Sequence, residues 1–303
     1  MLIVAALGGN ALLRRGEKAS VEAQRANVKV AATCLASILR AGHKLVITHG
    51  NGPQVGLLAM QGAAFDPEIA HPFDMLGAET EGMIGYMIEQ ELENALSHDR
   101  PVATLLTQVE VDQSDPAFQN PTKFIGPAYS KEEARSRAKT GGWQIAQDSG
   151  YWRRVVPSPM PQRIPDFEVI KLLLEKGVVV ICAGGGGIPT VRKQNGETVG
   201  IEAVIDKDAA SVLLAKNLKA DAVLLLTDVD AVYADYDEPN QRALRTLHPE
   251  DITGLNLPDG SMRPKVHAAQ DFSAFGGIAG IGRMQDALEI IEGRAGTRLV
   301  QSK

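Results

Sequence analysis

The sequence predicts an α/β protein, with helices on both faces of an open, mainly parallel sheet in a three-layer α/β/α sandwich. Short apolar runs alternate with segments of helical periodicity, which is typical of βαβ units with right-handed crossovers. Three of the apolar runs end in glycine-rich turns. In open α/β sheets, ligands bind at the carboxyl ends of the strands, so these turns also indicate where a site lies.

The first half of the chain supplies the start of this alternation. Ser20 is a good helix N-cap, and Gly42 ends the helical run that follows it. Of the apolar residues in the long helix, Met83, Ile84, Met87 and Leu92 are expected on or near one face. The other elements expected here are strands at 3–7, 45–49 and 102–107 and helices at 54–61 and 78–97.

Residues 112–165 differ in character, with many prolines, both tryptophans (Trp143 and Trp152) and few long apolar runs. The segment predicts an inserted subdomain or lid rather than more sheet. A chain of 303 residues suits two domains or one large α/β domain, and we interpret it as one domain, 1–303, with this segment inserted at about 112–165. The alternation then resumes with a helix at 166–176, a strand at 178–183, a helix at 207–219, a strand at 222–227, a helix opening at Pro264-Lys265, a strand near 278–281, a helix at 284–292 and a strand near 297–300.

Composition narrows the class of protein. The 303 residues carry 31 Lys and Arg against 37 Asp and Glu, so the net charge is −6 and no broad basic surface for nucleic acid is expected. No apolar stretch reaches the length of a membrane span, and no leader peptide is recognisable, so a cytoplasmic protein is expected. Cys34 and Cys182 both lie in apolar runs and are interpreted as reduced, buried thiols.

The three glycine turns are Gly8-Gly9-Asn10, Gly50-Asn51-Gly52 and Gly184 to Gly187. Glycine lets backbone N–H groups approach a ligand closely, and helix N-termini add positive partial charge. Three such turns at one sheet edge predict a wide cradle for a ligand with several negative charges, such as a nucleotide. Four consecutive glycines also indicate a close approach of the backbone to another group.

Three lysines are candidates for the positive charge of this site. The chain has no Gly-Lys dipeptide, so a P-loop is absent. Lys207, between Asp206 and Asp208, and Lys265 both fall at predicted helix starts, where a cation is electrostatically misplaced unless an anion docks beside it. Lys123 lies in the predicted insertion. The alternative is that all three are ordinary solvated lysines.

Other polar positions leave both a structural and a functional interpretation open. His49 ends the second strand, where a hydrogen-bonded structural histidine is the better interpretation, and no Cys/His metal motif exists. Arg153-Arg154 is equally an anion contact or a solvated surface pair. The stretch from Thr227 to Tyr233 closes an apolar strand and either borders a ligand or only ends that strand.

Together these motifs resemble the carbamate kinases of the amino acid kinase fold. The resemblance runs nearly end to end, in the expected order. The matching stretches are Ala6–Ala11, His49–Gly56, Pro121–Lys123 with Ile125–Pro127, Arg153–Pro159, Gly184–Pro189, Glu202–Asp208, Leu226–Asp230, and Gly260–Met262 with Pro264-Lys265.

This resemblance implies a reversible, Mg²⁺-dependent reaction in which ATP and carbamate give ADP and carbamoyl phosphate. In fermenting cells the family commonly runs toward ATP, using carbamoyl phosphate from arginine or a similar nitrogen source. It further implies an α/β/α sandwich with a small protruding subdomain over the site, and a homodimer. No nucleic-acid or membrane partner is expected, and Mg²⁺ is expected on the nucleotide phosphates rather than on protein ligands.

The resemblance also implies roles for individual residues. Lys123 would reach in from the protruding subdomain, and Lys207 and Lys265 would flank the nucleotide phosphates, with Asp208 holding them in place. The phosphoryl group and carbamate would be cradled by Gly8, Gly9, Asn10, His49, Gly50, Asn51 and Gly52. The nucleotide would be bordered by Gly184, Gly185, Gly186, Thr227, Asp228, Val229, Tyr233, Tyr236 and Met262.

Two details and three alternatives accompany the resemblance. Related kinases place a lysine before the first Gly-Gly, whereas this chain has Ala5-Ala6-Leu7, so Lys207 is expected to do that work. Arg263 stands where many members have glycine or an apolar residue.

The alternatives are a kinase of another small carboxylate or a nucleoside monophosphate, a nicotinamide-dependent dehydrogenase using Gly50 to Gly56, and a catalytically silent paralogue. The missing lysine and the Pro-Thr-Lys stretch disfavour the first, and an incomplete dinucleotide fingerprint disfavours the second.

Overall fold

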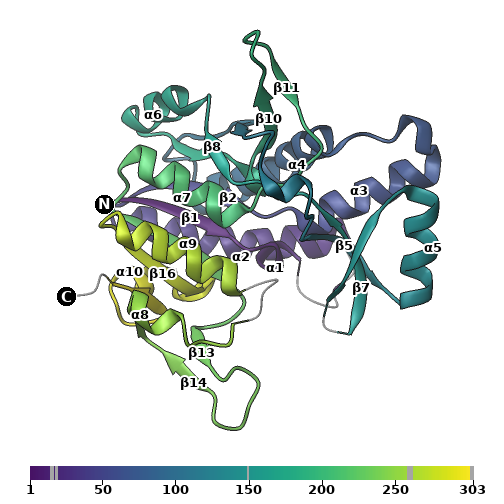
Figure 1. Cartoon of the computed structure of the whole chain (residues 1–303). Coiled ribbons are helices and arrows are strands. Elements are labelled where there is room, and N and C mark those ends of the chain that lie inside the picture. Colours follow the sequence, from purple (N-terminus) through teal and green to yellow (C-terminus); the bar gives the residue numbers. More distant parts are fainter. Residues whose placement is uncertain (14–16, 18–19, 149, 258–261, 301–303) are drawn as a thin grey trace.

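A computed structural model describes residues 1–13, 17, 20–148, 150–257 and 262–300. Its central sheet has the strand order β15-β17-β16-β12-β1-β2-β9-β3 (Figure 1). All neighbouring pairs are parallel except β16 and β17, which are antiparallel. The strands are β1 (Leu2–Leu7), β2 (Lys44–His49), β3 (Val102–Thr104), β9 (Val179–Ile181), β12 (Ala222–Thr227), β15 (Thr246–Leu247), β16 (Ile278–Arg283) and β17 (Thr297–Leu299).

Helices cover both faces of this sheet because successive side chains of its buried strands point to opposite sides. In β1, Ile3, Ala5 and Leu7 pack with α2 (Val21–Arg40), α4 (Phe73–Ala95) and α10 (Ala287–Ile291). Val4 and Ala6 pack on the other side with α6 (Phe167–Glu175), α7 (Lys207–Leu218) and α9 (Met262–Ala274). The predicted three-layer α/β/α architecture with a mainly parallel sheet is confirmed.

Several local predictions are confirmed and two are corrected. The Ser20 hydroxyl accepts a hydrogen bond from the backbone N–H of Ala23 and caps α2. Gly42 follows that helix with a φ of +87°, in the left-handed region that favours glycine. The strand expected at 102–107 ends at Thr104. Met83 lies on the outer face of α4, 39% exposed, although Ile84, Met87 and Leu92 are buried as expected.

A lobe projects from the body beside α3 (Gly52–Phe65), at the right of Figure 1. Its antiparallel sheet has the order β5-β7-β6 and is joined by α5 (Lys131–Gly141). The described residues within 112–165 add no strand to the central sheet, but they contain the three strands of this separate small sheet. These strands are half-buried ribbons, so they lack the long apolar runs of the central sheet. The strands are β5 (Lys123–Tyr129), β6 (Gln144–Asp148) and β7 (Tyr151–Val156).

The remaining elements are a second small sheet, a pair of strands and several short helices. A second small sheet has the order β11-β10-β4-β8, and β13 pairs with β14. Its strands are β4 (Gln108–Val111), β8 (Pro161–Arg163), β10 (Ile188–Arg192) and β11 (Thr198–Gly200), and the pair is β13 (Val232–Ala234) and β14 (Arg242–Leu244). The short helices are α1 (Gly9–Leu12), α8 (Pro249–Ile252), η1 (Pro67–Ile69), η2 (Pro116–Phe118), η3 (Gly184–Gly186) and η4 (Met284–Asp286).

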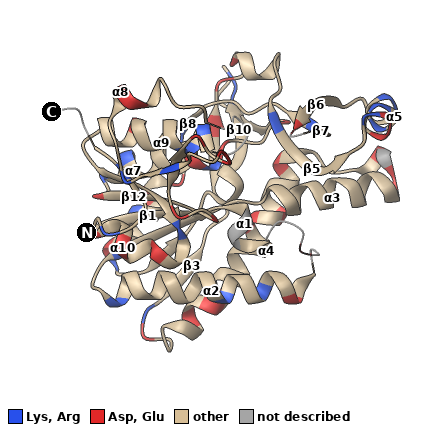
Figure 2. Cartoon of the chain, turned by 90° about the horizontal axis from the view of Figure 1, so that it is seen from below, with Lys and Arg blue, Asp and Glu red and all other residues tan. Residues whose placement is uncertain are grey.

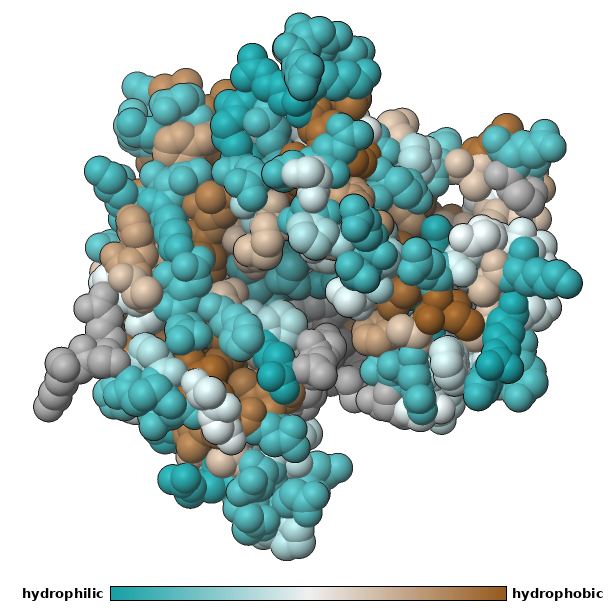
Figure 3. Space-filling model, in the orientation of Figure 1, coloured by the Kyte–Doolittle hydropathy of each residue, from teal (hydrophilic) through white to brown (hydrophobic). Residues whose placement is uncertain are grey.

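In the view of Figure 2, the positions of Lys and Arg are interspersed with those of Asp and Glu along the ribbon. The face in Figure 3 is mostly hydrophilic, with apolar residues in separate patches. Within the described part of the chain, no helix is both long and apolar enough to cross a bilayer. Cys182 is buried, as expected, whereas Cys34 is only half-buried, and both are free thiols.

Candidate active site

The first two glycine turns lie side by side at the carboxyl edge of the central sheet. β1 and β2 are parallel neighbours, with Leu7 opposite His49. The backbone N–H of Gly8 donates to Leu226 O of β12, and that of Gly50 donates to Leu7 O, each at 2.9 Å. The turns therefore continue the ladder of the sheet, and the end of β12 joins them at the same edge.

The glycines of these turns have two different surroundings. A Cβ on Gly8 would lie 2.9 Å from Leu226 O, and one on Gly50 would lie 2.9 Å from the backbone N of Gly9, so neither position accepts a side chain. A Cβ on Gly52, the first residue of α3, would meet nothing within 4 Å. Open space therefore lies at the N-terminus of α3, where the helix dipole favours an anion.

The third turn approaches its own chain rather than open space. A Cβ on Gly184 would lie 2.3 Å from His49 Nε2, and one on Gly185 would lie 2.1 Å from Asn51 Nδ2. A Cβ on Gly186 would lie 2.4 Å from Ile205 O. The run therefore needs glycine for internal packing, and its predicted position beside the nucleotide stays a prediction. The N–H of Gly184 is also already donated, to the Glu81 carboxylate at 2.7 Å.

Two polar residues of α4, Thr80 and Glu81, form hydrogen bonds with the second and third glycine turns. Thr80 Oγ1 accepts from Asn51 Nδ2 at 2.8 Å, while Glu81 Oε1 accepts from Gly184 N and Oε2 accepts from Thr107 N at 3.1 Å. Burial raises the pKa of Glu81 to about 8, against the two backbone hydrogen bonds that favour its carboxylate. Sequence reasoning missed both residues, although their helical spacing from the buried Ile84 places them on the inner face of α4.

Lys207 and Lys265 share one buried carboxylate. Lys207 is the first residue of α7, Lys265 lies in the first turn of α9, and both are 9% exposed. Lys207 Nζ donates to Asp208 Oδ1, and Lys265 Nζ is 2.8 Å from Asp208 Oδ2. Burial alone would raise the pKa of Asp208, but the two ammonium groups lower it below its usual range. Burial also lowers the pKa of Lys207 to about 8, with Asp208 opposing the shift.

Lys123 reaches this cluster from the protruding lobe. Its Nζ lies 2.5 Å from Asp206 Oδ2, and the other oxygen of Asp206 caps α7 by accepting from the N–H of Asp208 at 2.9 Å. Burial opposes ionisation of Asp206, but the Lys123 charge lowers its pKa. The fold thus assembles three ammonium groups and two carboxylates at one place. The interpretation of these lysines as solvated is wrong for Lys207 and Lys265, which are buried.

Comparison with known proteins gives the family of this chain. The sequence model described as the amino acid kinase family matches residues 1–280. The chain belongs to the amino acid kinase family.

Carbamate kinases are among its similar relatives within the amino acid kinase family. The carbamate kinase of Haemophilus influenzae is 56% identical over 99% of this chain and 97% of its own length. That of Rhizobium meliloti is 52% identical over 100% of this chain and 94% of its own length. The solved structure of the Giardia lamblia carbamate kinase bound to AMP-PNP is 40% identical, with a TM-score of 0.89 over 99% of this chain and 98% of that one.

Two of the residues predicted to bind substrate turn inward in this amino acid kinase. His49 is fully buried, with Nδ1 3.2 Å from Gly50 O, and burial lowers its pKa to about 4. The Asn51 side chain is 5% exposed and committed to Thr80. Both side chains are thus held by contacts inside the protein, which fits the structural interpretation of His49, and their predicted contact with substrate stays a prediction. The side chain of Asn10 and the residues Gly260 and Ser261 lie outside the described residues.

The predicted nucleotide-binding stretch follows β12 and adjoins the first turn. A Cβ on Gly8 would lie 3.7 Å from Thr227 Cα. Thr227 Oγ1 donates to Asp228 Oδ1 at 3.1 Å, and Tyr233 OH donates to Asp230 Oδ1 at 2.7 Å. Tyr236 is 51% exposed and meets the Tyr233 ring edge-on, with centroids 6.0 Å apart. Val229 and Met262 are half-buried.

Arg153 and Arg154 make contacts within the protein rather than forming a solvated pair. The Arg153 guanidinium donates to Gly126 O at 2.8 Å and to Asp148 at 3.0 Å. Arg154 lies between two rings, 4.8 Å from the centroid of Phe73 and 4.9 Å from that of Trp143. Arg263 donates to Leu257 O at 3.0 Å.

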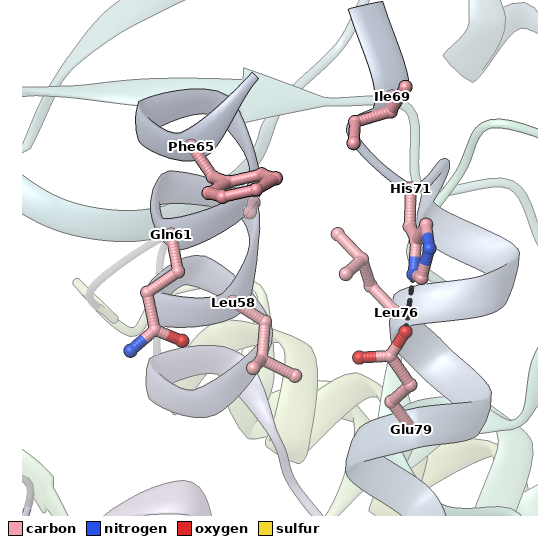
Figure 4. A pocket seen from close by; sticks show the side chains of 9 residues that line it. Leu58, Gln61, Phe65, Ile69, His71, Leu76 and Glu79 are labelled. Carbon is pink, nitrogen blue, oxygen red and sulfur yellow. Dashed lines mark hydrogen bonds and ion pairs between the residues drawn. The ribbon is translucent and has the colours of Figure 1, made fainter. Parts of the chain in front are cut away.

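A cavity of about 260 Å³ lies elsewhere, between α3, η1 and α4 (Figure 4). Apolar side chains face one another across it, and the ion pair of His71 and Glu79, 2.5 Å long, closes one side. None of the predicted site residues lines this cavity, so it is separate from the lysine cluster. Its lining residues are Leu58, Ala59, Gln61, Gly62, Phe65, Ile69, His71, Leu76 and Glu79.

Proposed function

We propose that this protein catalyses reversible phosphoryl transfer between ATP and carbamate, giving ADP and carbamoyl phosphate. The observation that carries the proposal is the buried Lys207–Asp208–Lys265 cluster, which Lys123 and Asp206 adjoin. It occurs in a chain 56% identical to a carbamate kinase over nearly its whole length. An AMP-PNP complex of the similar Giardia lamblia enzyme supports ATP as the nucleotide.

The residue inventory suits this reaction. Carbamate is already an anion, so its attacking oxygen needs no general base. The task is to overcome repulsion between anions and to hold them in line, which ammonium groups and backbone N–H groups do. We assign the phosphoryl group and carbamate to the backbone of the turns at Gly8-Gly9 and at Gly52, with Lys123 above them.

The nucleotide has its own proposed contacts. Lys207 and Lys265 flank its phosphates, and Asp208 keeps the two ammonium groups oriented and partly neutralised. The stretch from Thr227 to Tyr236 borders the rest of the nucleotide at the end of β12, with Met262 nearby.

Mg²⁺ is proposed to arrive with the nucleotide and to neutralise charge on its phosphates. The carboxylates at the cluster, Asp206 and Asp208, are each committed to lysines. Over the described ranges, no group of three or more His, Cys, Asp or Glu side chains could hold a metal ion. Both observations fit a metal held mainly by phosphate oxygens.

We also infer a cytoplasmic homodimer from the family resemblance, operating in arginine or related nitrogen metabolism. The outer face of α4 supports the dimer, because Met75, Met83 and Tyr86 are exposed there at helical spacing. Phe65 and Ile69, at the rim of the cavity in Figure 4, are 84% and 61% exposed. Light scattering of the protein and of Met83→Glu tests this, since a monomeric wild-type protein would contradict the proposed dimer.

One assay tests the proposed activity. Purified protein is mixed with Mg-ADP and carbamoyl phosphate, and ATP formation is followed with luciferase. ATP formation well above the uncatalysed background is the expected result. No ATP above that background would contradict the proposal and leave the silent paralogue. Activity with acetyl phosphate but not with carbamoyl phosphate would instead favour a kinase of another small carboxylate.

A further inference from the structure

Adjacent side chains on α4 reach two different turns of the candidate site. Thr80 is fully buried and accepts the Asn51 Nδ2 hydrogen bond at 2.8 Å, while its own hydroxyl donates to Leu76 O at 2.8 Å. Glu81 is 1% exposed and accepts the Gly184 N–H at 2.7 Å. One turn of helix therefore holds the loops after both β2 and β9.

Glu81 is an unusual group to bury. A buried carboxylate is costly unless hydrogen bonds or a cation compensate for its lost hydration. Both of its oxygens accept backbone N–H groups, from Gly184 and Thr107, and no ion pair with it occurs within the described part of the chain. Thr107 Oγ1 in turn accepts from Ala183 N at 2.9 Å. The carboxyl group thus ties together the loops that follow β3 and β9.

Direct contacts continue from these turns to the lysine cluster. The Asn51 side chain fills the space beside Gly185, and Gly186 packs against the backbone of Ile205. Ile205 immediately precedes Asp206, whose carboxylate caps α7 and binds Lys123. The glycine run is therefore packed between the Thr80-Glu81 pair and the segment that carries Lys207.

We propose that Thr80 and Glu81 are positioning residues for phosphoryl transfer, acting through the Asn51 and Gly184 turns on the segment that carries Lys207. Both are at most 1% exposed, so we assign them no contact with substrate. The inference rests on the proposed function, because its effect is measured as a rate of ATP formation. It predicts a loss in kcat, since transfer depends steeply on the placement of the cationic groups.

The experiment compares isosteric variants at these positions. Glu81→Met fills the same volume without an acceptor, whereas Glu81→Gln keeps one oxygen for the Gly184 N–H. We expect Glu81→Met to lower kcat on the order of 10²-fold with a small change in KM for ADP. Glu81→Gln is expected to restore most of that loss. Thr80→Val, which keeps its shape, is expected to lower kcat by about 10-fold through one lost hydrogen bond.

Ile88→Ala is the matched control. Ile88 is fully buried on the inner face of the same helix, and its aliphatic side chain makes no hydrogen bond to either turn. Its cavity is expected to lower the Tm without lowering kcat. Thr80→Val keeps the experiment decisive if Glu81→Met does not fold.

Three outcomes would overturn the inference. The first is wild-type kcat in both Thr80→Val and Glu81→Met. The second is an equal loss of kcat in Glu81→Gln and Glu81→Met. The third is a loss of kcat in Ile88→Ala as large as in a test variant with the same loss of Tm. A wild-type protein that forms no ATP would instead contradict the proposed function. An active wild type with equally active variants would leave that function intact and reject only the positioning role.

Discussion

Lys123 and Asp206 lie 83 positions apart in the chain, yet the lysine Nζ is 2.5 Å from the aspartate Oδ2. The pair joins the protruding lobe to the N-terminus of α7, next to Lys207. Its side chains are 33% and 25% exposed, so solvent reaches the pair and partly screens the attraction. A contact that solvent reaches suits a lysine that exchanges its carboxylate partner for a substrate anion.

Lys123→Ala is therefore expected to impair the reaction much more than the fold. Removing one preorganised cation typically costs on the order of 10²–10³ in kcat. The Tm should stay close to that of the wild type. Lys139→Ala, at an exposed position of α5 in the same lobe, is the control and should keep full activity. Equal activity of the two variants would remove Lys123 from the proposed site.

The pH dependence of the rate tests the role of Lys207. Its pKa is lowered to about 8 by burial, so the ammonium is lost as the pH rises through that value. If the charged form binds phosphate, kcat/KM falls on the alkaline side of about pH 8, because this parameter reports the ionisation of the free enzyme. Lys207→Arg keeps a charge there because arginine stays protonated, so its lower kcat/KM should not show this decline. The measurement is kcat/KM against pH for both proteins.

Glu81 titrates in the same range and has to be separated from Lys207. Its pKa is raised to about 8 by burial, so its carboxylate forms as the pH rises. That change strengthens acceptance of the backbone N–H groups and opposes the decline expected from Lys207. The alkaline decline should therefore persist in Glu81→Gln. Its loss in that variant, or its survival in Lys207→Arg, would contradict the assignment to Lys207.

Local sequence patterns predicted the strands and helices of the central sheet well, but they predicted poorly which distant residues contact one another. The apolar runs of β1, β2 and β12 and the Ser20 cap depend on nearby residues, so periodicity was enough. The link between Lys123 and Asp206 depends on how a distant lobe folds back, which no spacing encodes. The third glycine turn was recognised as a close approach, but its partners, His49 and Asn51, come from another strand end.

The Arg154 side chain is expected to hold the lobe against the body. It stacks between Trp143 of the lobe and Phe73 of α4, and each cation–π contact contributes about 0.5–2 kcal/mol. Arg154→Ala should raise KM for carbamoyl phosphate and speed amide hydrogen exchange across β5. Arg154→Lys keeps the charge but not the planar stacking, so it should only partly restore both values. Arg135→Ala on the exposed side of α5 is the control, and exchange rates equal to those of Arg154→Ala would contradict this role.

Gly185→Ala tests whether the third turn is packed as described. The residue has a φ of +69°, and its added Cβ would lie 2.1 Å from Asn51 Nδ2. Strain and overlap together should lower the free energy of unfolding by a few kcal/mol. Gly254→Ala, at an exposed position with nothing within 4 Å, should change it by less than about 0.5 kcal/mol. Urea denaturation measures both, and equal stabilities would show that the turn has room for a side chain.

The buried His49 predicts how the fold responds to acid. Burial lowers its pKa from 6.5 to about 4, so the native protein binds fewer protons than the unfolded chain between these pH values. Stability from this group is therefore present above about pH 6.5 and is lost as the pH falls toward 4. The lost contribution is on the order of 3 kcal/mol.

His49→Gln cannot take up this proton, so its unfolding free energy should fall less steeply over that window, whatever its value at neutral pH. His267→Gln, at an exposed position of α9, should keep the wild-type slope. Urea unfolding at several pH values between about 4 and 7 measures the slopes. Parallel curves for wild type and His49→Gln would mean that His49 takes up its proton equally in the native and unfolded states, which full burial in this position does not permit.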